Sequence, residues 1–194
     1  KKVSRNMRSE TLRPQPEDFD YDLKAALTSM VSVSTHIPDD AMTADVLGTE
    51  RMGNGVVIRE GIVLTIGYLV TEAQTVWIVS GETTIAGHVL GYDQATGFGL
   101  VQALGKLNLP PLPLGDSDQV KIGDSVVVAG GGGIDQAVAA HVVAKQEFAG
   151  YWEYLLDEAI FTAPAHPHWG GSGVLNAQGE LLGIGSLQVE HSDP

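Results

Sequence analysis

A dense series of short apolar runs between residues 31 and 164 constrains this chain most. The runs are rich in β-branched residues, and most are bounded by Gly, Pro, Asp or Asn. None is followed by the long amphipathic helix that joins parallel strands, so we expect antiparallel pairing through tight turns. The pattern predicts an all-β fold with strands at 31–35, 55–58, 62–66, 75–80, 86–92, 98–104, 124–130, 137–148 and 159–164.

The flanking and joining segments have a different character. Residues 1–20 are polar, with two prolines and no hydrophobic period, which is typical of an arm or linker. Residues 22–30 carry alanine and leucine at helical spacing and predict a short helix. The run "LNLPPLPLGDSD" at 107–118 holds prolines that a central strand would not accommodate, so it is interpreted as a connector between two halves.

The two halves share one pattern. Residues 53–69, "GNGVVIREGIVLTIGYL", align without gaps with residues 171–187, "GSGVLNAQGELLGIGSL". Each reads as a strand, a turn at glycine and a second strand, which predicts one hairpin used in both halves. Two β-subdomains on a common plan follow from this repeat.

Charge and composition exclude several function classes. The formal net charge of −13 opposes binding to nucleic acid or an anionic membrane, because both would begin with long-range repulsion. No run of apolar residues reaches the length of a membrane span, so no direct membrane insertion is expected. The absence of cysteine excludes disulfides and thiolate chemistry. Nothing in the sequence requires a cofactor.

Four short motifs occur in one order along the chain. They are "GNGVVIREGIVLTIGYLV" from residue 53, "GYDQATGFGLV" from 91, "LPLGDSDQVKIGDSVVVAG" from 112 and "HWGGSGVLNAQGELLGI" from 168. Together they resemble the trypsin-like serine peptidases, and in particular the bacterial HtrA (Deg) branch. The resemblance covers about residues 24 to 187.

The resemblance implies a fold and a set of boundaries. It implies two six-stranded-type antiparallel β-barrels of the chymotrypsin fold, with a first barrel at 21–106, the connector at 107–118 and a second barrel at 119–194. In the family a further segment closes the second barrel. It is not found in this sequence, so a second chain completing that barrel is one expected partner. A bacterial envelope location is implied by resemblance alone.

The catalytic positions of the family are all replaced. Its histidine falls on Tyr68 in "TIGYLV", its aspartate falls on Gly97 in "TGFG", and its serine falls on Gly170 when the motif is read without gaps. A serine nucleophile needs a base within hydrogen-bond reach, and that base needs an acid to orient it. The expected function is therefore a pseudopeptidase that binds or scaffolds proteins or extended peptides.

Two alternatives use the residues around this turn. In a shifted register, Ser172 is the nucleophile of an active endopeptidase, with His166 or His168 as base. Alternatively, His166 and His168 lie on one face at i, i+2 spacing and share a divalent metal ion. A third ligand for that ion is not evident from the sequence.

Aromatic residues gather between the third and the fourth of these motifs. Residues 146–162 contain Phe148, Tyr151, Trp152, Tyr154 and Phe161. Since Tyr and Trp are favoured in binding hot spots, Tyr151 and Trp152, together with Trp169, are the candidate contact residues for a protein or peptide partner.

Overall fold

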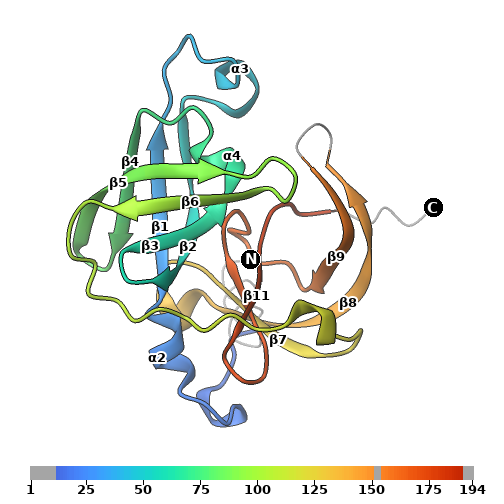
Figure 1. Ribbon diagram of the computed structural model, residues 1–194. Coiled ribbons are helices and arrows are strands. Elements are labelled where there is room, and N and C mark those ends of the chain that lie inside the picture. Colours follow the sequence, from blue (N-terminus) through green and yellow to red (C-terminus); the bar gives the residue numbers. More distant parts are fainter. Residues whose placement is uncertain (1–11, 151–153, 190–194) are drawn as a thin grey trace, which may run out of the picture.

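Six antiparallel strands close into a barrel in the first half of the chain (Figure 1). The computed structural model describes residues 12–150 and 154–189. The barrel runs in the order β1-β2-β3-β6-β5-β4, and β4 pairs again with β1. Its strands are β1 (Met30–His36), β2 (Glu50–Arg59), β3 (Ile62–Ile66), β4 (Thr75–Ser80), β5 (Thr83–Tyr92) and β6 (Phe98–Ala103).

The second half forms an antiparallel sheet in the order β11-β10-β7-β8-β9. Its strands are β7 (Ser125–Ala129), β8 (Val138–Ala149), β9 (Leu155–Ala163), β10 (Gly173–Leu175) and β11 (Leu181–Ile184). The predicted all-β architecture is confirmed. Within the described residues, the second sheet has five strands where the prediction was of a six-stranded type.

The repeated hairpin is present in both halves. In the barrel β2 pairs with β3, and in the second sheet β10 pairs with β11. Gly61 and Gly179 hold the corresponding turns with φ angles of 70° and 79°. Only glycine adopts this left-handed conformation without a steric cost, which explains why a glycine recurs at the same place in the repeat.

Short helices fill the ends of the sheets. The α-helices are α2 (Leu23–Leu27), α3 (Ala44–Leu47) and α4 (Gly67–Val70), and the 3-10 helices are η1 (Pro16–Asp18), η2 (Ser117–Gln119) and η3 (Gly133–Gln136). Helix α2 confirms the expected helix in shorter form, and the Asp22 carboxylate caps it by accepting from Ala25 N at 3.0 Å. Across the described ranges, no helix has the length and apolarity needed to cross a membrane.

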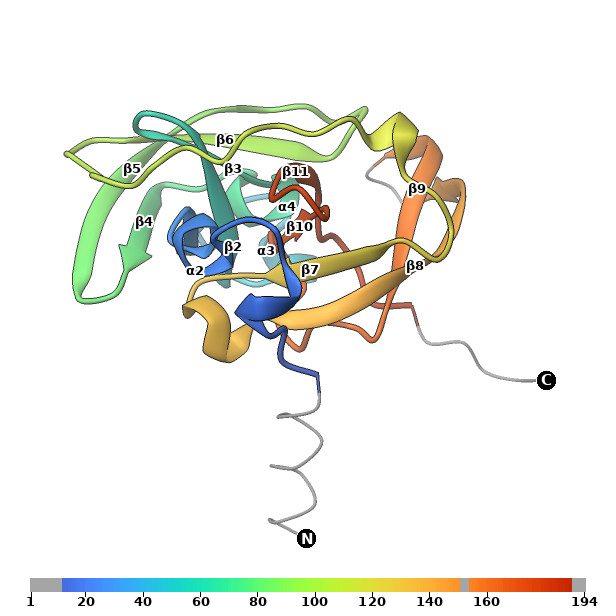
Figure 2. The same cartoon turned by 90° about the horizontal axis from the view of Figure 1, so that it is seen from below.

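The two sheets share a buried apolar core. Val56 of β2 packs with Leu175 of β10 and with Leu23 and Leu27 of α2, and all four are almost fully buried. This contact fixes the two halves together, because separating them would expose the apolar side chains to water. Figure 2 shows the barrel strands β4 to β6 at one end of the molecule and the β8–β9 pair at the other.

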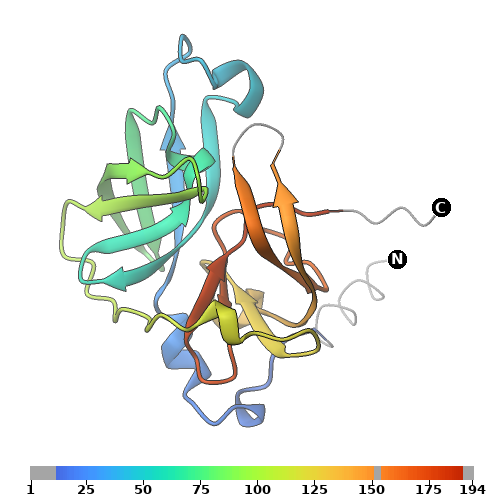
Figure 3. The ribbon, with the colours of Figure 1, turned by 45° about the vertical axis from the view of Figure 1, so that its right-hand side comes forward.

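The proline-rich connector joins the sheets on both sides. Leu112 is buried and its amide donates to Val57 O of the barrel at 2.8 Å. Leu114 then forms a parallel bridge with Leu181 of β11. Figure 3 shows this segment passing beneath the barrel to the second sheet. Between the two sheets lies a cleft that is lined by Ile66 and Phe98 of the barrel and by Val128 and Leu182 of the second sheet.

Candidate functional site

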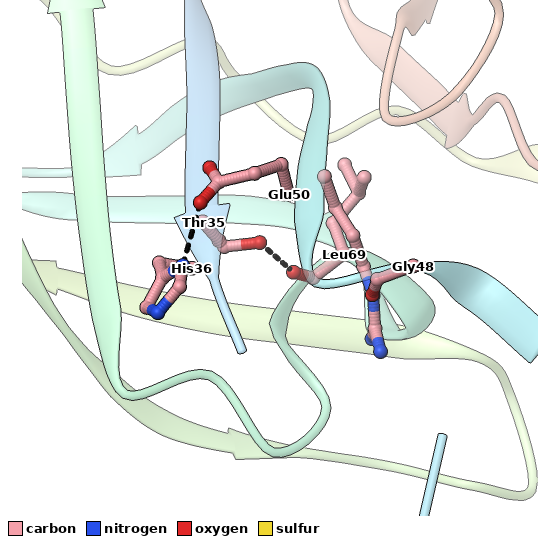
Figure 4. Close-up of polar contacts among 6 residues, drawn as sticks. Thr35, His36, Gly48, Glu50 and Leu69 are labelled. Carbon is pink, nitrogen blue, oxygen red and sulfur yellow. Dashed lines mark hydrogen bonds and ion pairs between the residues drawn. The ribbon is translucent and has the colours of Figure 1, made fainter. Parts of the chain in front are cut away.

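Tyr68 is placed at the cleft by helix α4, which follows β3 directly. The amide of Gly67 donates to Gly97 O at 2.7 Å, so the start of α4 is joined to the loop between β5 and β6. Thr35 Oγ1 of β1 donates to Leu69 O at 2.6 Å and holds the helix to the barrel (Figure 4). These bonds bring two of the three family positions, Tyr68 and Gly97, together.

Arg51 holds the other end of α4. Its guanidinium donates to Tyr68 O at 2.7 Å and to Thr71 O at 3.1 Å, and the side chain is almost fully buried. Burial lowers the pKa of Arg51, and the Glu72 carboxylate opposes that shift. Because an arginine stays charged even with a lowered pKa, it is a permanent donor to the carbonyls that end this helix.

The Tyr68 side chain occupies the space beside Gly170. A Cβ built on Gly170 would lie 2.5 Å from Tyr68 Oη, whereas the next ring atoms would be 3.6 and 3.9 Å away. The hydroxyl itself donates to Ser186 O at 3.0 Å. The structure therefore brings the first and third family positions into contact, with the tyrosine hydroxyl where a residue-170 side chain would begin.

Tyr154 occupies the space beside Gly97. A Cβ on Gly97 would lie 2.6 and 2.7 Å from two carbon atoms of the Tyr154 ring, and Gly97 itself has a left-handed φ of 79°. The Tyr154 hydroxyl is hydrogen-bonded to Ser186 Oγ. Tyr68 and Tyr154 thus both bond to Ser186 and fill the cleft between Gly97 and Gly170.

Asn54 ties the turn at residue 170 to the barrel. This buried side chain donates from Nδ2 to His168 O at 2.8 Å, and its backbone amide donates to Gly170 O at 2.8 Å. Its Oδ1 accepts from Gly131 N at 2.9 Å. Sequence reasoning missed Asn54, although the signal was present: it stands between two glycines of the first motif, where the family has serine.

Ser172 lies next to this turn and is fully buried. Its Oγ donates to Trp169 O at 2.7 Å, and its carbonyl accepts from Gly185 N at 2.7 Å. Both groups therefore serve the connection between the turn and the segment after β11. The hydroxyl donates to a backbone carbonyl, and the hydrogen bonds of the described His166 ring go to Gln136 O and His168 N and not to Ser172.

His166 and His168 have different surroundings. His166 is buried, its Nδ1 accepts from His168 N at 3.0 Å, and its Nε2 lies 2.8 Å from Gln136 O. Burial lowers the pKa of His166. His168 is exposed, and the two ring centroids are 6.3 Å apart. Both nitrogens of His166 thus have protein partners that a metal ion would need to displace.

No group of three or more His, Cys, Asp or Glu side chains suited to a metal ion occurs within residues 12–150 and 154–189. Metal binding by the two histidines stays a prediction. Titration calorimetry with Zn²⁺, Ni²⁺ and Cu²⁺ tests it directly.

Two further histidines, His36 and His141, each lie beside a polar side chain of a neighbouring strand. His36 of β1 is 2.6 Å from the Glu50 carboxylate of β2 (Figure 4), and Ser125 of β7 is 3.3 Å from His141 of β8. All four residues are exposed or partly exposed on paired strands. The imidazole–carboxylate pair is in the barrel and the hydroxyl–imidazole pair is in the second sheet, so they do not form one catalytic group.

A large groove of about 880 Å³ opens on the second sheet. Phe148 stacks near Tyr154 and Phe161, with ring centroids 6.3 and 6.0 Å away, and Trp169 also lines the groove. Of the candidate contact residues, Tyr151 and Trp152 lie outside the described residues. Trp169 is thus placed in a largely apolar groove together with Phe98, Phe148, Tyr154 and Phe161.

A six-stranded barrel joined to a second antiparallel sheet, with a cleft between them, defines the class of trypsin-like double β-barrels. The chain belongs to the trypsin-like peptidase domain family, whose model matches residues 53–184. That match includes Tyr68, Gly97 and Gly170, so the three positions predicted to correspond to the catalytic residues lie inside the family domain.

Curated relatives come from the HtrA branch. A serine protease HtrA-like protein of Staphylococcus epidermidis is 23% identical over 184 residues, covering 85% of this chain and 32% of its own length. The periplasmic pH-dependent serine endoprotease DegQ of Escherichia coli is 29% identical over 140 residues, covering 70% and 31%. The chain spans about a third of the length of these relatives.

Solved structures have the same fold. The active form of the Rv3671c protease from M. tuberculosis superposes with a TM-score of 0.68 at 21% identity, covering 89% of this chain and 76% of that one. The HtrA-type protease AlgW with a tripeptide gives 0.65 at 20% identity, covering 84% and 52%. The predicted trypsin-like, HtrA-type resemblance is confirmed.

Proposed function

We propose that this chain is a non-catalytic homologue of the trypsin-like peptidases that binds an extended peptide. One observation carries the proposal: Tyr68 and Tyr154 fill the space beside Gly170 and Gly97, where the family has its serine and aspartate. The match to the trypsin-like peptidase domain, together with aromatic side chains packed beside Gly97 and Gly170, supports a domain that keeps the fold without the acyl-transfer chemistry.

The chemistry of these residues supports the proposal. Gly170 has no side chain to attack a carbonyl, and Gly97 has none to orient a base. A tyrosine with an ordinary pKa of about 10 is protonated at neutral pH and is a poor general base. Ser172 is buried and donates to Trp169 O, so it is not available as a substitute.

Strand β9 offers a place for a peptide. It is an end strand of the second sheet, and within residues 12–150 and 154–189 it pairs with β8 alone. An end strand presents backbone groups to which an extended peptide can add by β-augmentation. The large groove lies beside it, lined by Leu156, Ile160 and Phe161 of β9 and by Leu182 of β11. Apolar side chains of the peptide would enter this groove.

The strand order of the barrel indicates how a partner would fit. In the barrel, β6 lies between β3 and β5. Counted from the first strand of each sheet, β9 takes the place of β3 and β11 takes the place of β5. A strand in the place of β6 would therefore lie between β9 and β11. A partner chain that supplies such a strand would complete the second barrel, which was the partner expected from the resemblance.

Binding and cleavage can be measured on the same peptides. We expect fluorescent heptapeptides with alternating apolar residues to bind, as measured by fluorescence anisotropy, and to be recovered intact by mass spectrometry. The matched control is the same peptide with N-methyl groups at alternate residues, which removes donors to β9 but keeps the side chains. Equal affinity for both peptides would contradict β-addition. Peptide cleavage that persists after the protein has been purified a second time would contradict the non-catalytic role.

A further inference from the structure

A second, smaller cavity lies at the rim of the barrel beside Tyr68. Its volume is about 260 Å³, room for roughly nine water molecules at about 30 Å³ each, which is the scale of one side chain and below that of most drug-sized ligands. Three tyrosines (Tyr68, Tyr92 and Tyr154) and two carboxylates (Glu72 and Asp93) line it, and no Lys, Arg or His of the described part of the chain does.

The Asp93 carboxylate is fixed in place by its own loop. Oδ2 accepts from Thr96 Oγ1 at 2.8 Å and Oδ1 accepts from Ala95 N at 3.1 Å. The bond from Thr96, followed by that from Ala95, keeps the pKa of Asp93 below its usual range, so the group is ionised at neutral pH. Since a carboxylate has about four acceptor positions, these bonds leave capacity for a further donor.

The Glu72 carboxylate, also part of the cavity lining, is held by residues Met42 and Thr43. Oε2 accepts from Thr43 N at 2.8 Å and from Thr43 Oγ1 at 2.6 Å, and Oε1 accepts from Met42 N at 3.1 Å. Among the described residues, Arg51 is the cation whose charge acts on Glu72. Its single positive charge does not balance the two carboxylates of the lining, Glu72 and Asp93.

The aromatic lining adds a second attraction for cations. Tyr68 and Tyr154 are held by their bonds to Ser186, and Tyr92 is half-exposed at the mouth. A cation over the face of a tyrosine ring is attracted by the ring quadrupole, and arginine also stacks on such faces. The net charge of −13 draws cationic ligands toward the molecule as a whole.

We propose that this cavity binds the guanidinium or ammonium group of an arginine or lysine side chain. The side chain would enter past Tyr92, stack between tyrosine rings and donate to Asp93 and Glu72. The proposed cation site rests on the proposed function in one respect: the arginine or lysine is taken to belong to the bound peptide. It gives the peptide a preferred residue type.

The cavity is tested first with a small ligand. Titration of the ¹⁵N-labelled protein with Nα-acetyl-arginine methylamide should shift the amides of Gly67 and Gly97 and reach saturation. The citrulline analogue has the same shape without the charge and should bind at least about tenfold more weakly. Equal binding of the two amides, or the absence of saturable shifts at the cavity, would overturn the proposal.

Variants separate the site from general electrostatics. Asp93→Asn keeps an acceptor for the turn but removes the charge, and it should weaken arginine binding about tenfold. The matched control is Glu60→Gln, which makes the same charge change at an exposed turn and should alter binding less than twofold. Tyr92→Phe should retain binding and Tyr92→Ala should weaken it. If Glu60→Gln weakened arginine binding as much as Asp93→Asn does, the binding would reflect overall charge and the proposed cavity site would be contradicted.

The same comparison within a peptide distinguishes the two proposals. If heptapeptides bind equally with arginine or citrulline, the peptide-binding function stands and the cation site fails as its specificity element. If no heptapeptide binds while the arginine amide does, the cation site stands and peptide binding at β9 fails.

Discussion

Tyr68 Oη lies 2.5 Å from the point at which a Cβ on Gly170 would stand. The hydroxyl and a side chain at residue 170 therefore exclude each other, although the rest of the tyrosine ring leaves room for a methyl group. The residue types at positions 68 and 170 are therefore coupled through the packing of the cleft.

A double-mutant cycle measures this coupling. Gly170→Ala should destabilise the protein by about 1–3 kcal/mol, because a methyl group is forced against a hydroxyl in a packed site. In the Tyr68→Phe background the same change should cost much less, since the nearest ring atoms are then 3.6 and 3.9 Å away. Urea unfolding of the four proteins gives both costs. The same cost in both backgrounds would refute the contact.

Gly97 provides a second packing test. Gly97→Ala meets both a left-handed φ of 79° and the Tyr154 ring. The matched control is Gly81→Ala, because Gly81 has a φ of 58° but nothing within 4 Å of its added Cβ. The control should cost about 1 kcal/mol from backbone strain alone. Gly97→Ala should cost about 1–3 kcal/mol more, from overpacking.

Equal losses of unfolding free energy in the two glycine variants would contradict this reasoning. They would mean that Tyr154 moves away from Gly97 at no cost.

Asn54 should control the order of the turn at residue 170. Asn54→Ala removes the donor to His168 O and the acceptor for Gly131 N, and each buried group left unpaired costs about 1–3 kcal/mol. Hydrogen exchange should speed up at Gly131. Unchanged exchange at this amide together with unchanged unfolding would show that the side chain is dispensable.

The strands could be predicted from the sequence because their signals are local. Alternating apolar residues and bounding glycines indicated β1 and β4 to within a residue or two, and the repeat indicated the β2–β3 and β10–β11 hairpins. Strand β9 begins earlier than predicted, at Leu155, because "LLDE" lacks the β-branched pattern on which the prediction relied. Helix α4 has four residues, too few for a helical period to be visible.

Motif register predicted which residues stand at the catalytic positions, and that assignment stays a prediction. It could not indicate which side chains pack in the cleft. Tyr154 comes from the second sheet and meets Gly97 of the first barrel, so their contact depends on how the two halves dock. Arg51 lies in a strand with solvent-facing neighbours, and its burial depends on the carbonyls that end α4. Such contacts are set by tertiary packing and leave no periodic signal in the sequence.

Stability should depend on the ionisation of His166. Burial lowers the pKa of His166 in the folded protein, whereas the unfolded chain has a histidine pKa of about 6.5. The unfolded state therefore binds more protons, and the contribution of His166 to stability is present above about pH 6.5 and is lost as the pH falls through the folded pKa. His166→Gln should flatten the pH dependence of the unfolding free energy below about pH 6.5. An unchanged slope would contradict the assignment.

Covalent labelling by a fluorophosphonate tests the central claim most directly, because the reagent modifies an activated serine whatever its position in the sequence. Intact-mass spectrometry of the treated protein, beside an active trypsin-like peptidase as control, should show no adduct on this chain while the control is fully modified. A stoichiometric adduct that peptide mapping places on Ser172 or on any other single serine, and that Ser→Ala substitution abolishes, would contradict the account.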